Sequence, residues 1–209
     1  MKDPDELNAL AGLFHLAGRL KTLKRQGWID RGVHQPESVA DHSWRLALMT
    51  ATMAGSNSGI DASRAVLLAL VHDLPEVVTG DVTPFDDQLS EQHADRTDLF
   101  TGLPEYSHTA EQSKTQAERD AIRVITADLP DEIATILVEA WEEYETGETA
   151  EAQLVRQLDK LETWLQAVEY QHEHPELIIE SFRKGTARDV TDPELLVLLE
   201  QINTSYHSG

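Results

Sequence analysis

The stretch LLALVHDLPEVVTGD, residues 67–81, carries the strongest structural signal in the sequence. An apolar run, Ala65–Val71, leads directly into His72 and Asp73, and a proline follows at position 75. Pro75 has no backbone N–H and its ring clashes with the preceding helical turn, so we expect the helix to kink or stop there. A charged carboxylate at the end of a buried segment is costly unless it is paired. The stretch therefore predicts a helix that delivers Asp73 to a partner inside the protein.

Helix signals also precede this stretch, whereas strand signals are poor throughout. Ser38, with Asp41 three positions later, is a capping-box variant that predicts the start of a helix. Leu46, Met49 and Met53 then share one face of that helix at helical spacing. This face is expected to pack against the core.

A turn and a second helix connect that segment to the opening stretch. The GSNSG run at residues 55–59 predicts the turn. Asp61 is a suitable cap for the helix DASRAVLLALVHD, residues 61–73. The centre of this helix is apolar all round, so we expect it to be buried.

The second half of the chain is helical after a polar interval. Residues 86–106 have little periodicity and predict a mobile loop or lid. Helices are expected over residues 107–127, 131–145 and 149–172, followed by a closing helix in DPELLVLLEQI at 192–202. The core stripe of the third helix comprises Leu154, Leu158, Leu161, Leu165 and Val168. The expected fold is all-α, a globular helical bundle, with residues 1–209 forming one domain and a polar loop insertion near 86–106.

Composition excludes several classes of protein and site. The chain has no cysteine, which rules out disulfides, iron–sulfur clusters and thiolate zinc sites. No apolar run approaches the roughly 20 residues that span a membrane, and the N-terminus does not resemble a signal peptide, so a cytoplasmic protein without a membrane partner is expected. The net charge of −21 opposes binding to a nucleic-acid polymer. This charge reflects either a solvated acidic surface or adaptation to a salty cytosol, where ions screen the repulsion.

One segment departs from this acidic trend. Between His15 and Arg31 the only acid is Asp30, and this cationic segment suggests a small anionic ligand. Chance clustering on a solvated helix face explains it equally well. Its basic residues are Arg19, Lys21, Lys24, Arg25 and Arg31.

Four residues form the strongest candidate for a chemical site. His42, His72, Asp73 and Asp159 each lie beside apolar core positions, on three different predicted helices. A single such histidine is more often a hydrogen-bonded core residue, and a single such aspartate a solvated edge residue. Taken together, the four are typical of a site where a divalent cation neutralises two carboxylates and accepts two imidazoles.

This arrangement resembles the HD-domain metal-dependent phosphohydrolases, and within them the branch of bacterial 5'-deoxynucleotidases and eukaryotic HD-domain-containing relatives. Three blocks carry the resemblance, which covers most of residues 13–170: GWIDRGVHQPESVADHSWRLALM, ALVHDLPEVVTGD and LVRQLDKLETWLQAVEY. The resemblance implies that His42, His72, Asp73 and Asp159 are metal ligands. It also implies a homodimer.

Further residues match positions near the metal in that family. Glu76 and Asp81 match acidic residues beside it, and Arg25 and Trp28 resemble an arginine and a tryptophan that contact the nucleotide, although that block aligns only with a gap. A lysine that follows the Gly–Asp step in those nucleotidases is missing, and Asp86 stands near its place. Lys114 is a candidate substitute. The loop at 86–106 also looks longer than in those relatives.

The residue types indicate what each group would do. Two imidazoles and two carboxylates suit one divalent transition metal (Mn, Co, Fe, Ni or Zn, with Mg also possible) better than Ca. Glu76, one helical turn after His72, is assigned water positioning or proton transfer. Asp81 would assist the leaving oxygen or hold the water, or simply cap the backbone segment that follows it. Arg25 would bind phosphate by a bidentate fork, and Trp28 would pack on the sugar or base or act as a core residue.

The sequence thus predicts a metal-dependent phosphohydrolase that releases phosphate from small nucleotides, and the resemblance favours (deoxy)nucleoside 5'-monophosphates. The same metal site would also suit an HD-type phosphodiesterase or a nucleoside triphosphate hydrolase. A nucleotide sensor without turnover is a further alternative, which the complete ligand set and Glu76 oppose. A di-iron oxygenase would need extra histidine ligands, and the candidates, His93 and His108, lie in or beside the polar loop.

Overall fold

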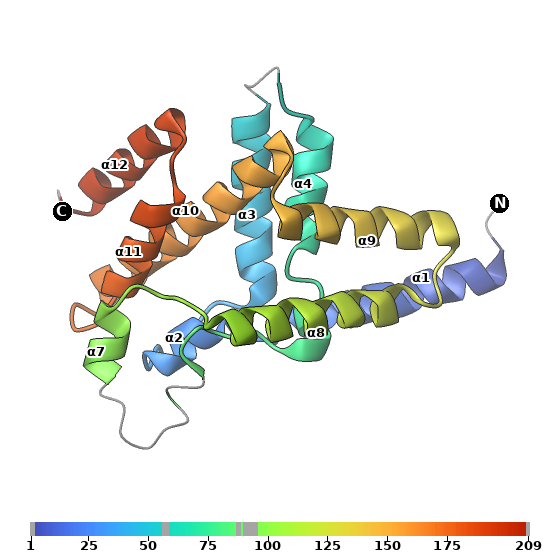
Figure 1. Cartoon of the computed structure of the whole chain (residues 1–209), viewed down its shortest axis with the longest axis horizontal. Helices are drawn as coiled ribbons and strands as arrows, with labels where there is room; N and C mark the ends of the chain where they lie inside the picture. Colours follow the sequence, from blue (N-terminus) through green and yellow to red (C-terminus); the bar gives the residue numbers. More distant parts are fainter. Residues whose placement is uncertain (1–2, 56–58, 87–88, 90–95, 208–209) are drawn as a thin grey trace.

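The chain folds into a set of helices that pack against one another at varied angles (Figure 1). The computed structural model describes residues 3–55, 59–86, 89 and 96–207, and within these ranges the regular elements are all helices. This confirms the expected all-α class. The described elements are α1 (Pro4–Ala17), the 3-10 turn η1 (Gly18–Lys21), α2 (Gln26–Asp30), α3 (Val39–Ala54), α4 (Ala62–Val71), α5 (Glu76–Thr79), α7 (Arg96–Thr101), α8 (His108–Thr126), α9 (Asp131–Thr146), α10 (Ala150–Glu173), α11 (Glu180–Asp189) and α12 (Pro193–His207).

The core lies where α3, α4 and α10 pack together. α3 contacts both α4 and α10, and α10 also contacts α9, α11 and α12. Leu46 of α3, Leu68 of α4 and Leu158 of α10 are fully buried between them. Burying a side chain of this size contributes about 1.5–3 kcal/mol relative to leaving it exposed. The three helices that carry the candidate ligands are therefore also the ones most firmly held by the core.

The predicted helix starts are present. Ser38 accepts the backbone N–H of Asp41 while the Asp41 carboxylate accepts the N–H of Ser38, which completes a capping box at the start of α3. Asp61 caps α4 through two backbone N–H groups. Ser107 and Thr149 cap α8 and α10 in the same way. These side chains fix where the helices begin because they satisfy N–H groups that have no partner within the helix.

The structure differs from the sequence expectations in three places. Residues 96–101, expected to be loop, form α7, and its Phe100 is buried. Helix α4 was expected to be buried on all sides, but its Leu70 is half exposed. On α10, Leu158 and Leu161 in the middle of the expected stripe are buried, whereas Leu154, Leu165 and Val168 are only partly buried. The expected turn at 55–59 lies partly outside the described residues.

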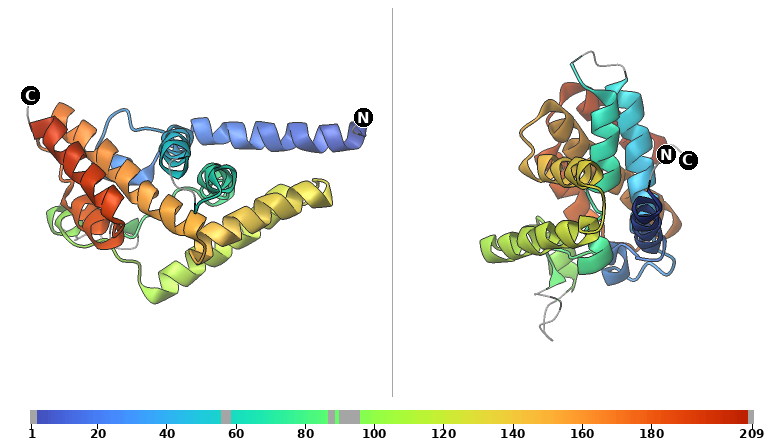
Figure 2. Two further views of the ribbon diagram at one scale, coloured as in Figure 1. Left: turned by 90° about the horizontal axis from the view of Figure 1, so that it is seen from above. Right: turned by 90° about the vertical axis from the view of Figure 1, so that its right-hand side faces the viewer.

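Three helices extend away from the core on one side. α8 and α9 pack against each other as neighbours, and α1 runs outward on the same side of the molecule (Figure 2). α1 has no fully buried residue. None of the described helices is long and apolar enough to cross a membrane.

Candidate metal centre and substrate cavity

His72 and Asp73 lie where helix α4 ends. His72 is the C-cap of α4, and the chain turns through Asp73 and Pro75 into the short helix α5. The expected stop at Pro75 is thus observed. The ring nitrogen Nδ1 of His72 donates to the carbonyl of Ala69, 2.9 Å away, within the last turn of α4. This bond leaves Nε2 of His72 as the nitrogen that faces the site.

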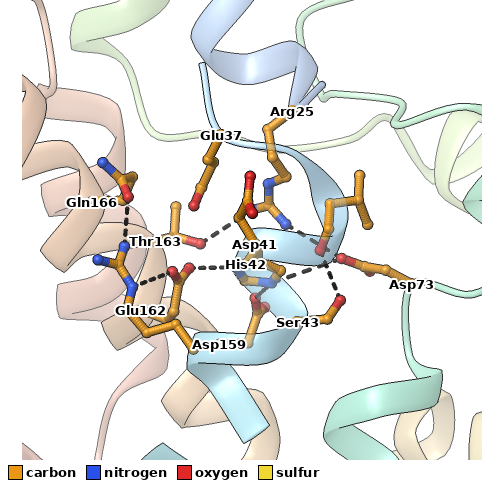
Figure 3. Close-up of polar contacts among 12 residues, drawn as sticks. Arg25, Glu37, Asp41, His42, Ser43, Asp73, Asp159, Glu162, Thr163 and Gln166 are labelled. Carbon is orange, nitrogen blue, oxygen red and sulfur yellow. Dashed lines mark hydrogen bonds and ion pairs between the residues drawn. The ribbon is translucent and has the colours of Figure 1, made fainter. Parts of the chain in front are cut away.

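The four candidate ligands meet around that nitrogen, and we call them the His/Asp cluster. Nε2 of His42 lies 3.3 Å from Nε2 of His72 and 3.2 Å from Oδ1 of Asp159. Oδ2 of Asp73 lies 3.0 Å from Nε2 of His72 and 3.7 Å from Nε2 of His42. Figure 3 shows His42, Asp73 and Asp159 converging from separate elements. The structure therefore brings all four residues together.

The spacing of these atoms fits a metal site. Metal–ligand bonds of about 2.0–2.2 Å place neighbouring ligand atoms roughly 3.0–3.5 Å apart around one ion. Ligand atoms of His42, His72 and Asp73 all lie within 4.8 Å of one another, and the oxygen of Asp159 is in reach of His42. The rings contribute neutral nitrogen donors and the acids contribute anionic oxygen, a donor set suited to divalent transition metals.

A further carboxylate, that of Glu162, binds the ring nitrogen of His42 that faces away from the cluster. Nδ1 of His42 donates to Oε2 of Glu162, which is completely buried. The other oxygen of Glu162 accepts from Nε of Arg45 at 2.8 Å. A carboxylate on the far nitrogen fixes the ring orientation and tautomer of a metal-binding histidine. Neither Glu162 nor Arg45 was predicted from the sequence. Glu162 lies one turn after Asp159, beside the apolar stripe, and a charged residue at such a position indicates a buried polar contact.

The electrostatics of the cluster favour a cation. Burial and Arg25 lower the pKa of His42, but Glu162 and Asp159 outweigh them and raise that pKa to about 10. Burial raises the pKa of Asp73, yet His72, His42 and Arg25 together bring it well below its usual range. The carboxylates around His42 therefore favour a positive charge at this point, and a divalent cation would supply it.

Asp159 is stabilised as an anion from the outer side of the cluster. Nζ of Lys160 lies 2.8 Å from Oδ2 of Asp159, and the hydroxyl of Tyr144 donates to the same oxygen at 3.4 Å. Burial raises the pKa of Asp159, but Lys160 and His42 bring it well below the ordinary value. One oxygen of this carboxylate is thus held by the protein while the other faces His42.

Glu76 lies in the cavity beside the cluster. Its carboxylate is buried, and Oε2 has no hydrogen-bond partner among the described residues. Burial first, and then the negative charges of Asp73 and Asp81, raise the pKa of Glu76 well above its ordinary value. An unpaired buried carboxyl of raised pKa is a suitable group to exchange a proton.

Asp81 has a structural bond as well as a place in the cavity. Its Oδ2 accepts the backbone N–H of Gln26 at 2.7 Å, which caps the first turn of α2. Because Arg25 directly precedes Gln26, this bond fixes the arginine over the site. The alternative role considered for Asp81 was a cap on the backbone segment that follows it, whereas the observed cap is on Gln26, 55 residues earlier in the chain.

Arg25 and Trp28 come from α2 and its N-cap. Nη1 of Arg25 lies 3.3 Å from Oδ2 of Asp73, and Nη2 lies 3.3 Å from Oγ1 of Thr163. Trp28 is 1% exposed, and its Nε1 donates to Glu37 at 2.9 Å. The Trp28 side chain is thus a core residue that also contributes to the cavity wall.

The cavity has a volume of about 1110 Å³ and opens over Asp73 and Asp159. Lys114 of α8 lines it and forms an ion pair with Glu118 at 2.5 Å. Asp86, which stands near the place of the missing family lysine, instead accepts a bond from Thr83 at 2.5 Å. The cationic segment is divided, because only Arg25 and Arg31 of its basic residues line the cavity.

The histidines proposed for a di-iron centre do not extend the cluster in the described structure. His93 lies outside the described residues. His108 is exposed at the first turn of α8 and belongs to neither of the two potential ligand groups found among the described residues, which are His42–His72–Asp73 and Glu37–His42–Glu162.

Comparison with known families agrees with this geometry. Residues 17–194 match the HD domain family, so the chain belongs to that family. The human 5'-deoxynucleotidase HDDC2 is 36% identical over 195 residues, which cover 93% of this chain and 84% of the relative. The Dictyostelium discoideum relative of the same name is 37% identical, with 78% of each chain covered. These findings confirm the predicted family and bear out the expected class, a metal-dependent phosphohydrolase.

Solved structures show the same fold. A conserved hypothetical protein from Pyrococcus furiosus superimposes with a TM-score of 0.68 at 28% identity, covering 92% of this chain and 98% of the other. A predicted metal-dependent phosphohydrolase from Magnetospirillum magnetotacticum superimposes with a TM-score of 0.65 at 21% identity, covering 97% and 95%. The second likeness supports the fold alone.

Proposed function

We propose that the protein is a metal-dependent phosphomonoesterase that releases inorganic phosphate from deoxynucleoside 5'-monophosphates. The observation that carries the proposal is the cluster of two imidazoles and two carboxylates, three of which (His72, Asp73 and Asp159) line the same cavity as Arg25 and Lys114. The curated relatives named 5'-deoxynucleotidase support the choice of substrate.

His42, His72, Asp73 and Asp159 would hold one divalent transition metal. Such an ion supplies a Lewis acid for a phosphoryl oxygen and lowers the pKa of water from near 16 towards about 7. With two anionic ligands the centre would be formally neutral. Glu162 and the carbonyl of Ala69 keep the two rings in the required orientation, with both Nε2 atoms facing inward.

Glu76 would exchange the proton of the attacking water. Its free Oε2 is buried in the cavity, near Asp73, and burial together with the charges of Asp73 and Asp81 raises its pKa, which favours holding a proton that can be exchanged. Asp81, which lies on the same side, would orient the water or the leaving oxygen with the oxygen that Gln26 does not occupy.

Arg25 would bind the phosphate. Its two guanidinium contacts are both long, at 3.3 Å, and a phosphate dianion offers shorter, charge-assisted bonds to the same fork. Lys114 would supply a second positive charge from α8, across the cavity from α2. Trp28 would support the sugar through the wall it forms.

The deciding experiment is a phosphate-release screen of the purified protein. Deoxy- and ribonucleoside mono- and triphosphates, together with cyclic nucleotides, would be tested separately with Mn, Co, Mg and Zn. We expect phosphate from the deoxynucleoside 5'-monophosphates. Release from triphosphates or cyclic nucleotides alone would instead favour the triphosphate hydrolase or phosphodiesterase alternative. Tight binding without turnover would favour the sensor.

The homodimer and the cytoplasmic location remain predictions. Phe14 of α1 and Trp44 of α3 are 67% and 65% exposed, which leaves large apolar side chains available for self-association. Sedimentation analysis at several concentrations tests the dimer, and a mass equal to one chain throughout would contradict it.

A further inference from the structure

A second arginine, Arg31, lines the cavity, and each of its three nitrogens donates a hydrogen bond within the protein. Nε of Arg31 donates to the carbonyl of Ile178 at 3.1 Å, Nη1 to the carbonyl of Gly27 at 2.8 Å, and Nη2 to Oγ of Ser181 at 2.6 Å. Burial lowers the pKa of Arg31 to about 10, so its charge is retained at neutral pH. Its guanidinium is thus a fixed structural cation and has few donors left for a phosphate.

Aromatic rings cover both faces of this guanidinium. Its central carbon lies 4.0 Å from the ring centre of Phe182 and 4.1 Å from that of Phe100. Phe85 packs edge-on against Phe100, with ring centres 5.6 Å apart at 82°. Stacking of a planar guanidinium on aromatic rings is favourable, and more so when the groups are removed from water.

Phe100 reaches this position from α7, the helix found in the expected polar loop. α7 is held on α11 by Nζ of Lys184, which donates to the carbonyl of Thr101 at 2.8 Å. Close packing adds to this bond, because a Cβ built at Gly185 would lie only 3.3 Å from Pro104. α7 and α11 also make direct contacts. α7 is therefore attached to the body of the protein at several points.

The front of this assembly faces the cavity while Phe100 lies behind it. Arg31, Phe85 and Phe182 all line the cavity, and we call them the aromatic wall. Phe100 is 3% exposed and does not line the cavity. It can influence a bound molecule only through the residues in front of it.

The aromatic wall is displaced along α2 from the phosphate-binding position proposed above. Arg25 and Arg31 flank α2, and six residues of helix span roughly 9 Å. Trp28 lies between them and contacts Phe182, with ring centres 4.5 Å apart. The rings of Phe85 and Phe182 offer planar stacking surfaces for a heteroaromatic ring, while all three nitrogens of Arg31 already donate to groups of the protein.

We propose that the aromatic wall receives the nucleoside part of the substrate and that Phe100 is a positioning residue that holds the wall in place. This inference rests on the function proposed above. The insertion helix α7 then contributes to nucleoside affinity without touching the phosphate or the His/Asp cluster.

Phe100→Ala tests the proposal, with Leu103→Ala as a matched truncation of a more exposed residue in the same segment. The measurements are KM and kcat for a deoxynucleoside 5'-monophosphate, and inhibition by the free deoxynucleoside and by inorganic phosphate. For Phe100→Ala we expect KM and the inhibition constant of the deoxynucleoside to rise about tenfold. kcat and inhibition by phosphate should stay within about twofold, and Leu103→Ala should match the wild type.

Unchanged deoxynucleoside inhibition in Phe100→Ala overturns the inference, and so does an equal loss of phosphate and deoxynucleoside affinity. If Phe100→Ala does not fold, as judged by thermal unfolding, Arg31→Lys takes its place, since it keeps the charge but loses the planar stacking group. The same split between the two inhibitors is then expected. A wild-type protein that turns over no nucleotide overturns the proposed function and this inference with it, whereas turnover with no split overturns the inference alone.

Discussion

Arg25 and Arg31 flank the same short helix and line the same cavity, but their guanidinium groups differ in how fully the protein satisfies them. Arg31 makes three short hydrogen bonds and lies between two aromatic rings. Arg25 makes two contacts of 3.3 Å, and burial is offset by Asp81 and Asp73, which raise its pKa. The difference separates scaffold from ligand site. Arg31, whose nitrogens donate to groups of the protein, forms part of the cavity wall. Arg25, whose contacts are longer, is available to bind an anion.

The same contrast holds for the carboxyl groups. Glu162 has both oxygens bonded, one to His42 and one to Arg45, whereas Oε2 of Glu76 has no partner within the described structure. An unpaired buried polar atom lowers stability. The unpaired carboxyl of Glu76 therefore lowers the stability of the protein but leaves a group free to exchange a proton.

The largest expected effect follows from Asp73→Ala. This change removes a ligand oxygen that lies 3.0 Å from Nε2 of His72 and also a partner of Arg25. We expect turnover and metal uptake to be lost together, measured by phosphate release and by metal analysis after dialysis. A variant that retained the wild-type metal content would show that Asp73 is not a ligand.

The next effect separates chemistry from metal binding. Glu76→Gln keeps the shape of the side chain but removes its ability to accept a proton. We expect kcat to fall by roughly 10²–10⁴, with metal content and KM close to those of the wild type. Glu76→Ala should likewise spare the metal. Equal metal loss in the Glu76 and Asp73 variants would make Glu76 a ligand and would remove its assigned role.

A smaller effect is expected behind the cluster. Glu162→Gln replaces the anion that accepts from Nδ1 of His42 with a neutral amide. We expect a ten- to hundredfold loss of metal affinity, with turnover recovered at saturating metal. Glu169→Gln is the control, because Glu169 also pairs with Arg45 and lies on the same helix, two turns further on. An identical loss in both variants would place the effect in Arg45 rather than in the orientation of His42.

The smallest effect concerns the surface rather than the cavity. With a net charge of −21, screening by KCl should raise the melting temperature by reducing self-repulsion. We expect a gain of a few degrees between about 0.1 and 2 M KCl, on the order of 1 kcal/mol. Sucrose at matched osmolality serves as the control. Stability that is indifferent to molar salt would contradict adaptation to a salty cytosol.

Local patterns were sufficient for much of the fold. Ser38, Asp61 and Pro75 act on backbone groups within one turn, so their effects on α3, α4 and α5 are visible in the sequence. α7 was missed because its helix is stabilised by contacts of Phe100 with residues remote in the sequence, and a polar segment gives no sign of them.

The site divides along the same line. His42, His72, Asp73 and Asp159 were predicted because the resemblance to a family places them. The structure brings ligand atoms of the first three within 4.8 Å of one another and places Asp159 3.2 Å from His42. Arg45 and Glu162 are 117 residues apart in the sequence, and no local pattern indicates that they pair. The hydrogen bonds of Arg31 likewise could not be predicted, because its partners Ile178 and Ser181 lie near the far end of the chain.

The place where α4 ends has a consequence for the order of binding. The peptide dipoles of a helix give its carboxyl end a partial negative charge, and α4 ends at His72. Together with Asp73 and Asp159, that end repels a phosphate dianion until a cation arrives. We therefore expect the metal to bind first and the nucleotide second, and we expect nucleotide affinity to fall when the metal is chelated.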